Sequence, residues 1–373
     1  MIVAKKNFLS VFLILLFLFP NPLSSQEISS RGLFVTVIQD PPVLGSRQEI
    51  LKLVDFARKA HIQTLFVQIY RANKAWFPSK IADSTPYASS LKNVSTDPFA
   101  LLIKEAHASG IKVHAWCNLL SLSGNAEAKL LKKYGNEILT RNLEQKKTLE
   151  DYKIDNQYFL EPGDLRVREE LSNIVEEILL TYPDLDGIQF DYIRYPDKHP
   201  AYGYTKMNMD RFKQTTGFKT IDDESRIWKD WKRDQVTGLL EMLVKKVRLL
   251  RPNIQISTTG CMSYSRAFHE AYQDWPSWLN RGLVDFITLM CYTSKPEEFE
   301  KYISEGKSKV VDFKKANIAV GAYNQISSPE TFKQEFEFCE NSGGGACVIL
   351  HYGSLLENSA LVDPLTKPIN LRR

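Results

Sequence analysis

The chain lacks an excess of charge of either sign, and it lacks long apolar runs beyond its first residues. Lysine and arginine number 48 and aspartate and glutamate 44, so the formal net charge is only +4. Nucleic-acid-binding domains usually carry a strongly basic face, so this near balance does not indicate a nucleic-acid partner. No apolar stretch after residue 25 is long enough to cross a bilayer, and the sequence therefore predicts no stable membrane insertion of the mature chain.

Motifs for metal, nucleotide and cofactor chemistry are also absent. There is no HExxH, GxSxG, P-loop or dinucleotide-binding glycine pattern, and "SGGGAC" precedes a predicted strand, the wrong context for phosphate binding. The histidines are scattered, and His114 lies deep in a predicted strand, as an interior residue would. We therefore expect no metal site and no cofactor.

The cysteines show neither CxxC spacing nor histidines in zinc-finger order. Their odd number leaves at least one thiol unpaired in a monomer. Four of the five lie in or just after predicted strands, so we expect buried core cysteines rather than a disulfide framework. The five are Cys117, Cys261, Cys291, Cys339 and Cys347.

The N-terminus has the charged, apolar and small-residue order of a secretory signal peptide. Lys5 and Lys6 precede an apolar run over residues 8–19, and Ser24 and Ser25 follow it. We predict cleavage after residue 25 and an exported protein, periplasmic or secreted; an uncleaved N-terminal anchor is the alternative. There is no cysteine near the cleavage region, so the sequence does not predict a lipid anchor.

Apolar or alternating runs recur along the rest of the chain with helical stretches between them, which is typical of repeated βα units and a parallel sheet. There are eight such runs, the number that closes a (β/α)8 TIM barrel. We find no linker or second repeat, so residues 26–373 are predicted to form one α/β barrel domain. The predicted strands are residues 32–37, 64–70, 112–118, 185–190, 254–260, 285–292, 317–323 and 346–352.

Alternation along these strands places polar side chains together on one face. Gln68 and Tyr70 share a face of the second strand, and Trp116 and Asn118 share one of the third. The opposite faces are nearly all apolar, which suits packing against an outer ring of helices. The polar faces are expected to meet at the barrel mouth. The loops after the third and fourth strands are the longest, and we expect them to build a substrate groove there.

The stretch "LDGIQFDYIRYP", residues 185–196, begins like a buried strand and ends with an acid, an arginine and two tyrosines. Asp191 falls at the carboxyl end of the fourth predicted strand, where barrel enzymes place catalytic groups. Arg194 follows three residues later and would hold this carboxylate ionised or bind a substrate oxygen. The alternative is a structural ion pair at the strand end. Asp186, at the opposite end of the strand, is predicted to be a structural turn residue.

"LDGIQFDYIRYP" resembles the hallmark of the glycosyl hydrolase-like family 10 barrels, a bacterial group formerly catalogued as a domain of unknown function. "TLFVQIYRANKAWFPSKIADSTPY" is similar to the second-strand segment of that family, "VHAWCN" to its third-strand segment and "YFLEPGDLRVREEL" to its Leu-Asp-Pro-Gly segment. These matches cover most of the first half of the barrel in the expected order. The second half matches mainly by strand pattern and by "LMCYT".

The resemblance implies a TIM barrel that acts on glycans, and a member of the group is associated with hydrolysis of peptidoglycan glycan strands stripped of their peptides. This chain has Glu161 where the family commonly has Asp before Pro-Gly. In the related family 18 chitinases the fourth-strand acid is a glutamate, and that position falls on Ile193 here, so the chitinase mechanism does not transfer. Tyr292, in "LMCYT", resembles the sixth-strand tyrosine of the chitinases.

Cleavage of a glycosidic bond usually needs two carboxyl groups. Asp191 is the first candidate for its position, and Glu161, on the segment before the helix that leads into the fourth strand, is the second. Asp164 is the alternative second carboxylate, although either acid could instead cap that helix, and Asp164 reads as its N-cap. The catalytic candidates are Asp191 and Glu161.

Aromatic side chains at strand ends would contact the apolar faces of sugar rings, and polar side chains there would bind hydroxyl or acetamido groups. Any single aromatic residue is more often part of the core. The predicted substrate-binding residues are Arg194, Tyr195, Gln68, Tyr70, Arg71, Trp76, Trp116, Asn118, Tyr292, Tyr323, Asn324, His351 and Tyr352.

These observations predict an exported glycoside hydrolase that cleaves a bacterial cell-wall or related amino-sugar polysaccharide without a cofactor. The rival hypothesis is a glycan-binding barrel without turnover. No glutamate ends the fourth or seventh strand, which favours the rival, whereas Asp191 with Arg194 at a strand end favours the enzyme. A transferase, with a sugar replacing water as the acceptor, also stays open.

Overall fold

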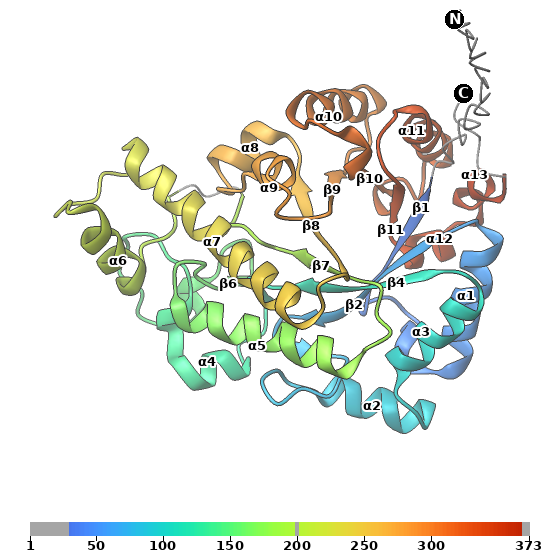
Figure 1. Cartoon of the computed structure of the whole chain (residues 1–373), viewed down its shortest axis with the longest axis horizontal. Helices are drawn as coiled ribbons and strands as arrows, with labels where there is room; N and C mark the ends of the chain where they lie inside the picture. Colours follow the sequence, from blue (N-terminus) through green and yellow to red (C-terminus); the bar gives the residue numbers. More distant parts are fainter. Residues whose placement is uncertain (1–29, 198–200, 368–373) are drawn as a thin grey trace, which may run out of the picture.

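A computed structural model describes residues 30–197 and 201–367 of the chain (Figure 1). The predicted signal peptide, residues 1–25, lies outside the described residues. Among the residues that are described, no helix is both long and apolar enough to cross a membrane.

Eight parallel strands close into a barrel, which confirms the predicted (β/α)8 fold. Neighbours pair in the order β1-β11-β10-β9-β8-β7-β4-β2, and pairing of β1 with β2 closes the ring. Each strand begins and ends within two residues of its predicted bounds. The barrel strands are β1 (Arg31–Val35), β2 (Thr64–Arg71), β4 (Lys112–Asn118), β7 (Gly187–Asp191), β8 (Gln255–Cys261), β9 (Phe286–Cys291), β10 (Ala316–Gly321) and β11 (Cys347–Leu350).

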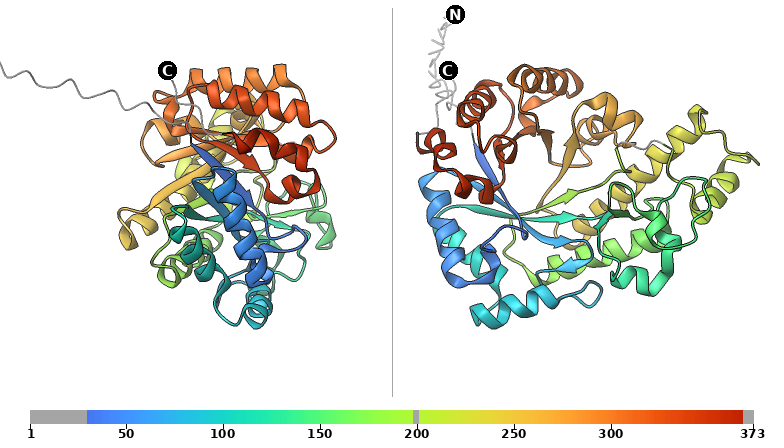
Figure 2. Two further views of the ribbon diagram at one scale, coloured as in Figure 1. Left: turned by 90° about the vertical axis from the view of Figure 1, so that its right-hand side faces the viewer. Right: turned by 180° about the vertical axis from the view of Figure 1, so that it is seen from behind.

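Helices connect successive strands and cover the outside of the barrel (Figure 2). Side-chain caps begin several of them, as at α1, where Ser46 accepts from the Glu49 N–H. The α-helices are α1 (Arg47–Lys59), α2 (Thr85–Val94), α3 (Pro98–Ala108), α4 (Lys129–Tyr134), α5 (Leu165–Thr181), α6 (Lys206–Thr216), α7 (Arg226–Leu250), α8 (Tyr264–His269), α9 (Trp275–Asn280), α10 (Pro296–Lys309), α11 (Pro329–Asn341), α12 (Tyr352–Glu357) and α13 (Asp363–Thr366).

The loops after β4 and β7 carry extra structure, and they pack together. The first contains α4 and the antiparallel pair β5 (Ser121–Ser123) and β6 (Tyr158–Phe159), and the second contains α6. Figure 1 shows α4, β6 and α6 together at one side of the barrel. The Tyr204 N–H donates to the Arg141 carbonyl at 3.0 Å, and Arg211 donates to the Gly163 carbonyl at 2.6 Å. The two insertions therefore form one lobe.

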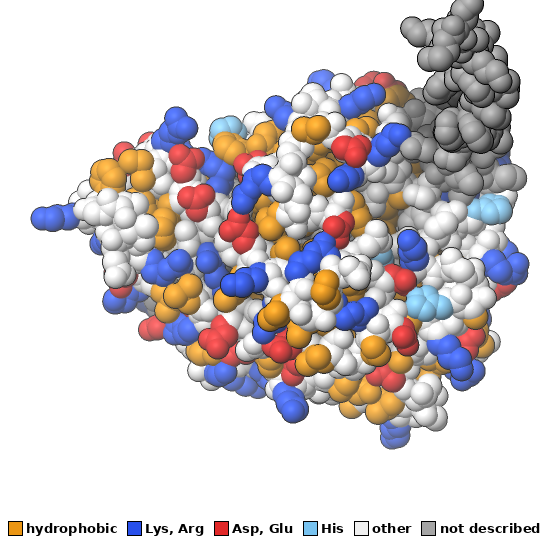
Figure 3. All heavy atoms as spheres, in the orientation of Figure 1, with side chains coloured by type: hydrophobic (Ala, Val, Ile, Leu, Met, Phe, Trp, Pro, Cys, Tyr) orange, Lys and Arg blue, Asp and Glu red, His pale blue; other side chains and the backbone are white. Residues whose placement is uncertain are grey.

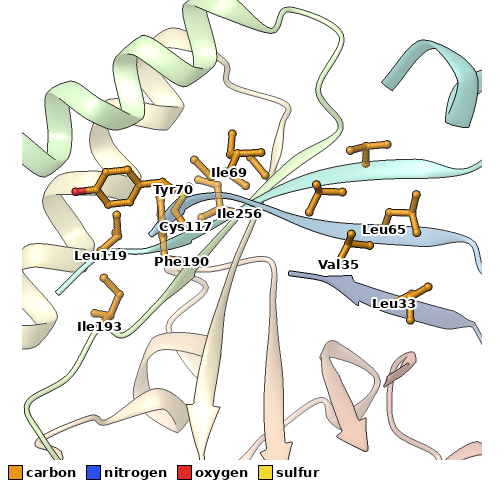
Figure 4. Close-up of a cluster of buried hydrophobic side chains, with 14 of the residues drawn as sticks. Leu33, Val35, Leu65, Ile69, Tyr70, Cys117, Leu119, Phe190, Ile193 and Ile256 are labelled. Atoms are coloured by element: carbon orange, nitrogen blue, oxygen red, sulfur yellow. The ribbon is translucent and has the colours of Figure 1, made fainter. Parts of the chain in front are cut away.

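The main hydrophobic core lies between the barrel and its helices, as the strand alternation predicts. Leu33 and Val35 of β1 belong to it, together with Leu65 of β2 and Ile256 of β8 (Figure 4). Full burial of such a side chain stabilises the fold by about 1.5–3 kcal/mol. Inside the barrel a separate, smaller apolar cluster contains Phe34, which alternates with Leu33 and Val35 along β1. On the face that Figure 3 shows, positive and negative side chains are interspersed.

Gly187, which begins β7, is required by the packing inside the barrel. A Cβ atom at this position would lie 2.2 Å from Cε1 of His114 on the neighbouring strand. The His114 ring is buried between Phe66 and Phe286, with centroid distances of 5.1 and 5.7 Å. Burial lowers the pKa of His114 to about 4, so the ring is neutral at neutral pH. The prediction of an interior histidine is confirmed.

The cysteine prediction is correct for three residues and wrong for two. Cys117, Cys261 and Cys291 are buried free thiols. Cys339, near the end of α11, forms a disulfide with Cys347, the first residue of β11, and their Cα atoms are 5.9 Å apart. The chain turns back directly from helix to strand, so two cysteines with no motif spacing become neighbours.

Candidate functional site

A cavity of about 570 Å³ opens at the carboxyl ends of the barrel strands. Every barrel strand, or the residues that directly follow it, contributes to its wall, which is the place where TIM barrels carry their active sites. Its described lining includes Phe34, Thr36, Gln68, Arg71, Trp116, Asn118, Asp191, Tyr192, Arg194, Asp197, Thr259, Arg266, Met290, Tyr292, Tyr302, Tyr323 and His351.

Asp191 ends β7 and is held rigidly in this wall. Its Oδ2 accepts from the indole N–H of Trp116 at 3.0 Å. Its Oδ1 accepts from the Thr259 hydroxyl at 2.6 Å and from the Tyr192 N–H at 2.7 Å. An ionised carboxylate only accepts hydrogen bonds, and three groups donate to this one although the side chain is only about 7% exposed. These hydrogen bonds fix the carboxylate group in the cavity wall.

The residues after Asp191 place a guanidinium beside it. Tyr192 has φ +57°, a left-handed backbone conformation that is uncommon for a bulky residue and concentrates at functional sites. The Arg194 guanidinium lies 4.4 Å from the centroid of the Tyr192 ring, in cation–π contact. Nη1 of Arg194 is 4.0 Å from Oδ1 of Asp191, an ion pair without a hydrogen bond. The turn thus aims both charges at the same cavity.

Burial shifts the pKa values of two other cavity side chains toward their neutral forms. Burial raises the pKa of Tyr292 well above its usual value, and the negative charge of Asp191 adds to the shift, so the phenol keeps its proton. Burial lowers the pKa of His351, which keeps its imidazole neutral at neutral pH. Tyr292 and Tyr323 meet edge to face at 5.8 Å, and Tyr323 is 42% exposed. Their rings form a wall that a sugar face can contact.

The structure brings most of the predicted site residues to this cavity. The predicted residues that line it are Asp191, Arg194, Gln68, Arg71, Trp116, Asn118, Tyr292, Tyr323 and His351. The predicted residues outside its described lining are Glu161, Tyr195, Tyr70, Trp76, Asn324 and Tyr352.

Tyr70 leaves the cavity because β2 is irregular there. The register of β2 against β4 shifts between Gln68 and Tyr70, so the alternation that would put both on one face is broken. Gln68 donates to Oδ1 of Asn118 at 2.9 Å in the cavity wall, whereas the ring of Tyr70 lies in the core beside Cys117 and Leu119 (Figure 4). The expectation that Gln68 and Tyr70 share a face is wrong for this reason.

The other predicted residues outside the cavity have different surroundings. Tyr352 begins α12 and packs against Phe56 of α1, with ring centroids 5.1 Å apart. Trp76 is only half-buried and lines a small cleft that shares Thr36 and Gln68 with the cavity wall. Asn324 is exposed at the end of the short 3-10 helix over residues 322–324.

Glu161 and Tyr195 form a pair behind the cavity wall. Glu161 is fully buried, and it accepts hydrogen bonds from the Tyr195 hydroxyl, from the Thr140 hydroxyl at 2.9 Å and from the Gly163 N–H at 3.1 Å. Burial raises the pKa of Glu161. Asp164 directly precedes α5 and accepts from the Arg166 N–H at 2.9 Å, so its predicted role as an N-cap is confirmed. The pair ties the turn after β7 to the loop before α5.

Asp186 has the structural role predicted for it. Its carboxylate accepts from the Val113 N–H at 2.8 Å and lies 2.7 Å from Nε2 of His107. It precedes the first residue of β7, whereas Asp191 is the last residue of that strand. The two acids are therefore at opposite ends of the barrel.

Sequence reasoning missed several cavity residues. Asp197 lines the cavity as its second carboxylate and lies 3.7 Å from Arg266 of α8. Tyr192 lies within the stretch "LDGIQFDYIRYP" and Asp197 directly follows it, so these two had a signal, and Thr259 lies in the fifth predicted strand. Arg266 and Tyr302 lie on helices after β8 and β9 and had none.

A second hollow of about 680 Å³ adjoins the cavity. Tyr302 lines both, and Ser263 of the second hollow follows Met262 of the first. Its other lining residues are Lys295, Glu297, Glu298, Lys301 and Glu305. Within the part of the chain that the structure describes, no group of three His, Cys, Asp or Glu side chains is arranged to hold a metal ion.

A closed barrel with carboxylates, guanidinium groups and aromatic rings at its mouth defines a TIM-barrel protein with its site at the carboxyl ends of the strands. The sequence model described as glycosyl hydrolase-like 10 matches residues 31–338, and the chain belongs to that family. This confirms the resemblance drawn from the first-half motifs, and family membership supports a glycoside hydrolase.

Curated relatives and solved structures agree with this assignment. Glycosyl hydrolase DigH of Escherichia coli K12 is 22% identical over 353 residues, which cover 84% of this chain and 78% of the relative. Glycosyl hydrolase YngK of Bacillus subtilis is 23% identical over 269 residues, which cover 68% and 50%.

Among solved structures, the catalytic domain of a β-amylase from Paenibacillus polymyxa is similar in fold, with a TM-score of 0.56 at 11% identity and 92% and 95% coverage of this chain and of that chain. An endo-β-1,4-mannanase from Thermotoga petrophila gives a TM-score of 0.52 at 12% identity, with 87% and 68% coverage. At these identities the likeness concerns the fold.

Proposed function

We propose that the protein is an exported glycoside hydrolase that cleaves an amino-sugar polysaccharide of the bacterial cell wall, with peptide-stripped peptidoglycan glycan strands as its substrate. The observation that carries the proposal is Asp191, a nearly buried carboxylate with three hydrogen-bond donors at the mouth of a family-typical barrel. The family resemblance supports the glycan, and the N-terminal sequence pattern supports export.

Asp191 is the residue that we assign to the base or nucleophile role. Its hydrogen bonds from Trp116, Thr259 and Tyr192 hold the carboxylate in one orientation at the cavity, which either role needs. Asp197 is then the second carboxyl group, which would protonate the leaving oxygen. It lines the same cavity as Asp191.

The cavity also has the shape and surface that a polysaccharide needs. Trp116, Tyr292 and Tyr323 present aromatic surface, which contacts sugar faces with little loss of side-chain entropy. The hollow beyond Tyr302 extends the cavity along the barrel mouth, so a chain of several sugars can lie across both. These features support a polymer rather than a single sugar as the substrate.

A glycan-binding barrel without turnover is the second candidate, and two observations favour it. Ile193, at the position where the chitinase acid would fall, is fully buried in the core. Glu161 is enclosed behind the cavity wall. A hydrolase therefore has to rely on Asp191 and Asp197, which the binding hypothesis does not need.

The test is product analysis by chromatography with mass detection. Purified residues 26–373 are incubated with intact peptidoglycan, peptide-stripped glycan strands and poly-N-acetylglucosamine. We expect new fragments from the stripped strands and a loss of roughly 100- to 10,000-fold in rate for Asp191→Asn or Asp197→Asn. Asp55→Asn, on an exposed face of α1, is the matched control and should retain the wild-type rate.

The outcomes separate the two candidates. Fragments from the wild type and Asp55→Asn but not from Asp191→Asn establish a glycosidase. Retention of all variants on one glycan, with no fragments from any, would replace the hydrolase with the binding protein.

A further inference from the structure

The cavity holds more positive charge than its carboxylates balance. Its described lining contains Arg71, Arg194 and Arg266 against Asp191 and Asp197. The neutral His351 adds no charge at neutral pH. A cavity built only for neutral sugars has no need of this excess, because each guanidinium that is taken from water must regain its hydrogen bonds.

The pairing of these charges shows which arginine is in excess. Arg266 lies 3.7 Å from Asp197 and donates to the Met262 carbonyl at 2.5 Å. Arg194 lies 4.0 Å from Asp191. Arg71, the last residue of β2, makes no ion pair with any residue that the structure describes, and it donates a long hydrogen bond of 3.4 Å to the Ser123 hydroxyl.

Arg194 also keeps free donors, although it has a charge partner. Its guanidinium makes no hydrogen bond to a described residue, and the buried Nη1 is without a hydrogen-bond partner. Asp191 already accepts three hydrogen bonds from other groups, so it does not take the Arg194 donors. Arg194 and Arg71 are close enough to Tyr192 that both positive charges act on its phenol. Two guanidinium groups with unused donors therefore line the same cavity.

We propose that the cavity selects a sugar that carries a carboxylate, and that Arg71 and Arg194 bind this group. The planar guanidinium presents parallel N–H donors that match the two oxygens of a carboxylate, which a hydroxyl or an acetamido group cannot do. Such a carboxylate occurs as the lactyl group of a peptide-free muramic acid or as the C6 acid of a uronic acid. Arg71 is then a specificity-determining residue. The inference rests on the proposed glycan function and names the chemical group that its substrate must present.

The experiment pairs a change in the substrate with a change in the protein. Peptide-stripped glycan strands are compared with the same strands after carbodiimide conversion of their carboxylates to methylamides. Wild type, Arg71→Gln and Arg71→Lys are assayed for kcat/KM on both, and hyaluronan and chito-oligosaccharides serve as the uronic acid and neutral arms. Arg58→Gln, an exposed residue of α1, is the control.

For the wild type we expect amide conversion to lower kcat/KM roughly 10- to 100-fold, the range for a lost hydrogen bond to a charged group. Arg71→Gln should lose a similar factor on the acidic strands and keep only a small part of the preference for them, because Arg194 still contacts the carboxylate. Arg71→Lys should keep part of the preference for the acidic strands, since lysine keeps the positive charge but lacks the two parallel N–H donors of the guanidinium. If the cleavage of hyaluronan depends on Arg71, the recognised carboxylate belongs to a uronic acid.

Two results would overturn the inference. The amidated strands could be cleaved as fast as the acidic ones by the wild type, or Arg71→Gln could keep the full preference. If the wild type cleaves no glycan, the proposed hydrolase fails, and calorimetric binding of the same acidic and amidated strands then decides the carboxylate inference on its own. Equal binding of the two would reject it.

Discussion

Glu161 provides the sharpest test of how the site works, because sequence and structure assign it different tasks. As a catalytic acid it would have to reach the substrate. It is instead fully buried behind the cavity wall, where it accepts a hydrogen bond from the Tyr195 hydroxyl. Tyr195 belongs to the turn that carries Arg194 and Asp197 into the cavity. We therefore expect Glu161 to position this turn, and Glu161→Gln and Tyr195→Phe to behave as positioning variants.

The magnitude follows from the contacts. Tyr195→Phe removes one of three hydrogen bonds to a buried carboxylate, which should lower the free energy of unfolding by about 1.5–3 kcal/mol at neutral pH. Glu161→Gln keeps the shape and an acceptor oxygen, so it should lose less. Both should raise KM, because the turn loosens, while kcat falls far less than for Asp191→Asn or Asp197→Asn, since both variants retain these two carboxyl groups.

The pH dependence has a definite sign. Burial raises the pKa of Glu161 in the folded protein above its value in the unfolded chain. A raised pKa contributes stability that is fully present below the unfolded value and is lost as pH rises through the folded value. The stability of Glu161→Gln relative to wild type should therefore improve from pH 5 to pH 8, which urea unfolding at both pH values measures.

One pattern would refute this assignment. If Glu161→Gln abolished turnover as completely as Asp191→Asn, with unchanged urea stability and unchanged glycan binding, Glu161 would be the second catalytic carboxyl group. Tyr195→Phe is the control within the pair. It removes the positioning contact but leaves the Glu161 carboxyl group, so it would then retain most activity.

Three further predictions concern stability and binding. Arg31→Met leaves the buried Glu340 carboxylate, which lies 2.8 Å from Arg31, without its ion-pair partner. It should lower the free energy of urea unfolding by about 3–5 kcal/mol. Replacing Cys339 and Cys347 together by Ala opens a loop with a sequence separation of 8 and should cost about 2.5 kcal/mol in the same assay; a wild-type midpoint that dithiothreitol does not lower would contradict this. Tyr192→Gly should weaken glycan binding, because the Arg194 guanidinium loses its contact with the Tyr192 ring. The free energy of unfolding should stay within about 1 kcal/mol of wild type, since glycine adopts φ +57° without strain. A large loss of stability would contradict this prediction.

The alternation of apolar residues determined the barrel. Eight runs of period two, separated by amphipathic stretches, fix eight strands and their outward faces, because only one face of each strand can pack on helices. The same pattern carried Asp191, Trp116 and Tyr292 to the mouth, since each lies at the carboxyl end of its strand. These residues could be found without a structure.

Tertiary structure decided which of the other candidates face the cavity. A register shift in β2 sent Tyr70 into the core, and no rule of alternation could anticipate an irregularity that depends on pairing with β4. Enclosure of Glu161 by Tyr195 and Thr140 joins segments far apart in the sequence, and so does the approach of Arg266 to Asp197. Strand position is a local property that the sequence determines by itself, whereas burial and charge pairing depend on loops meeting across the barrel mouth.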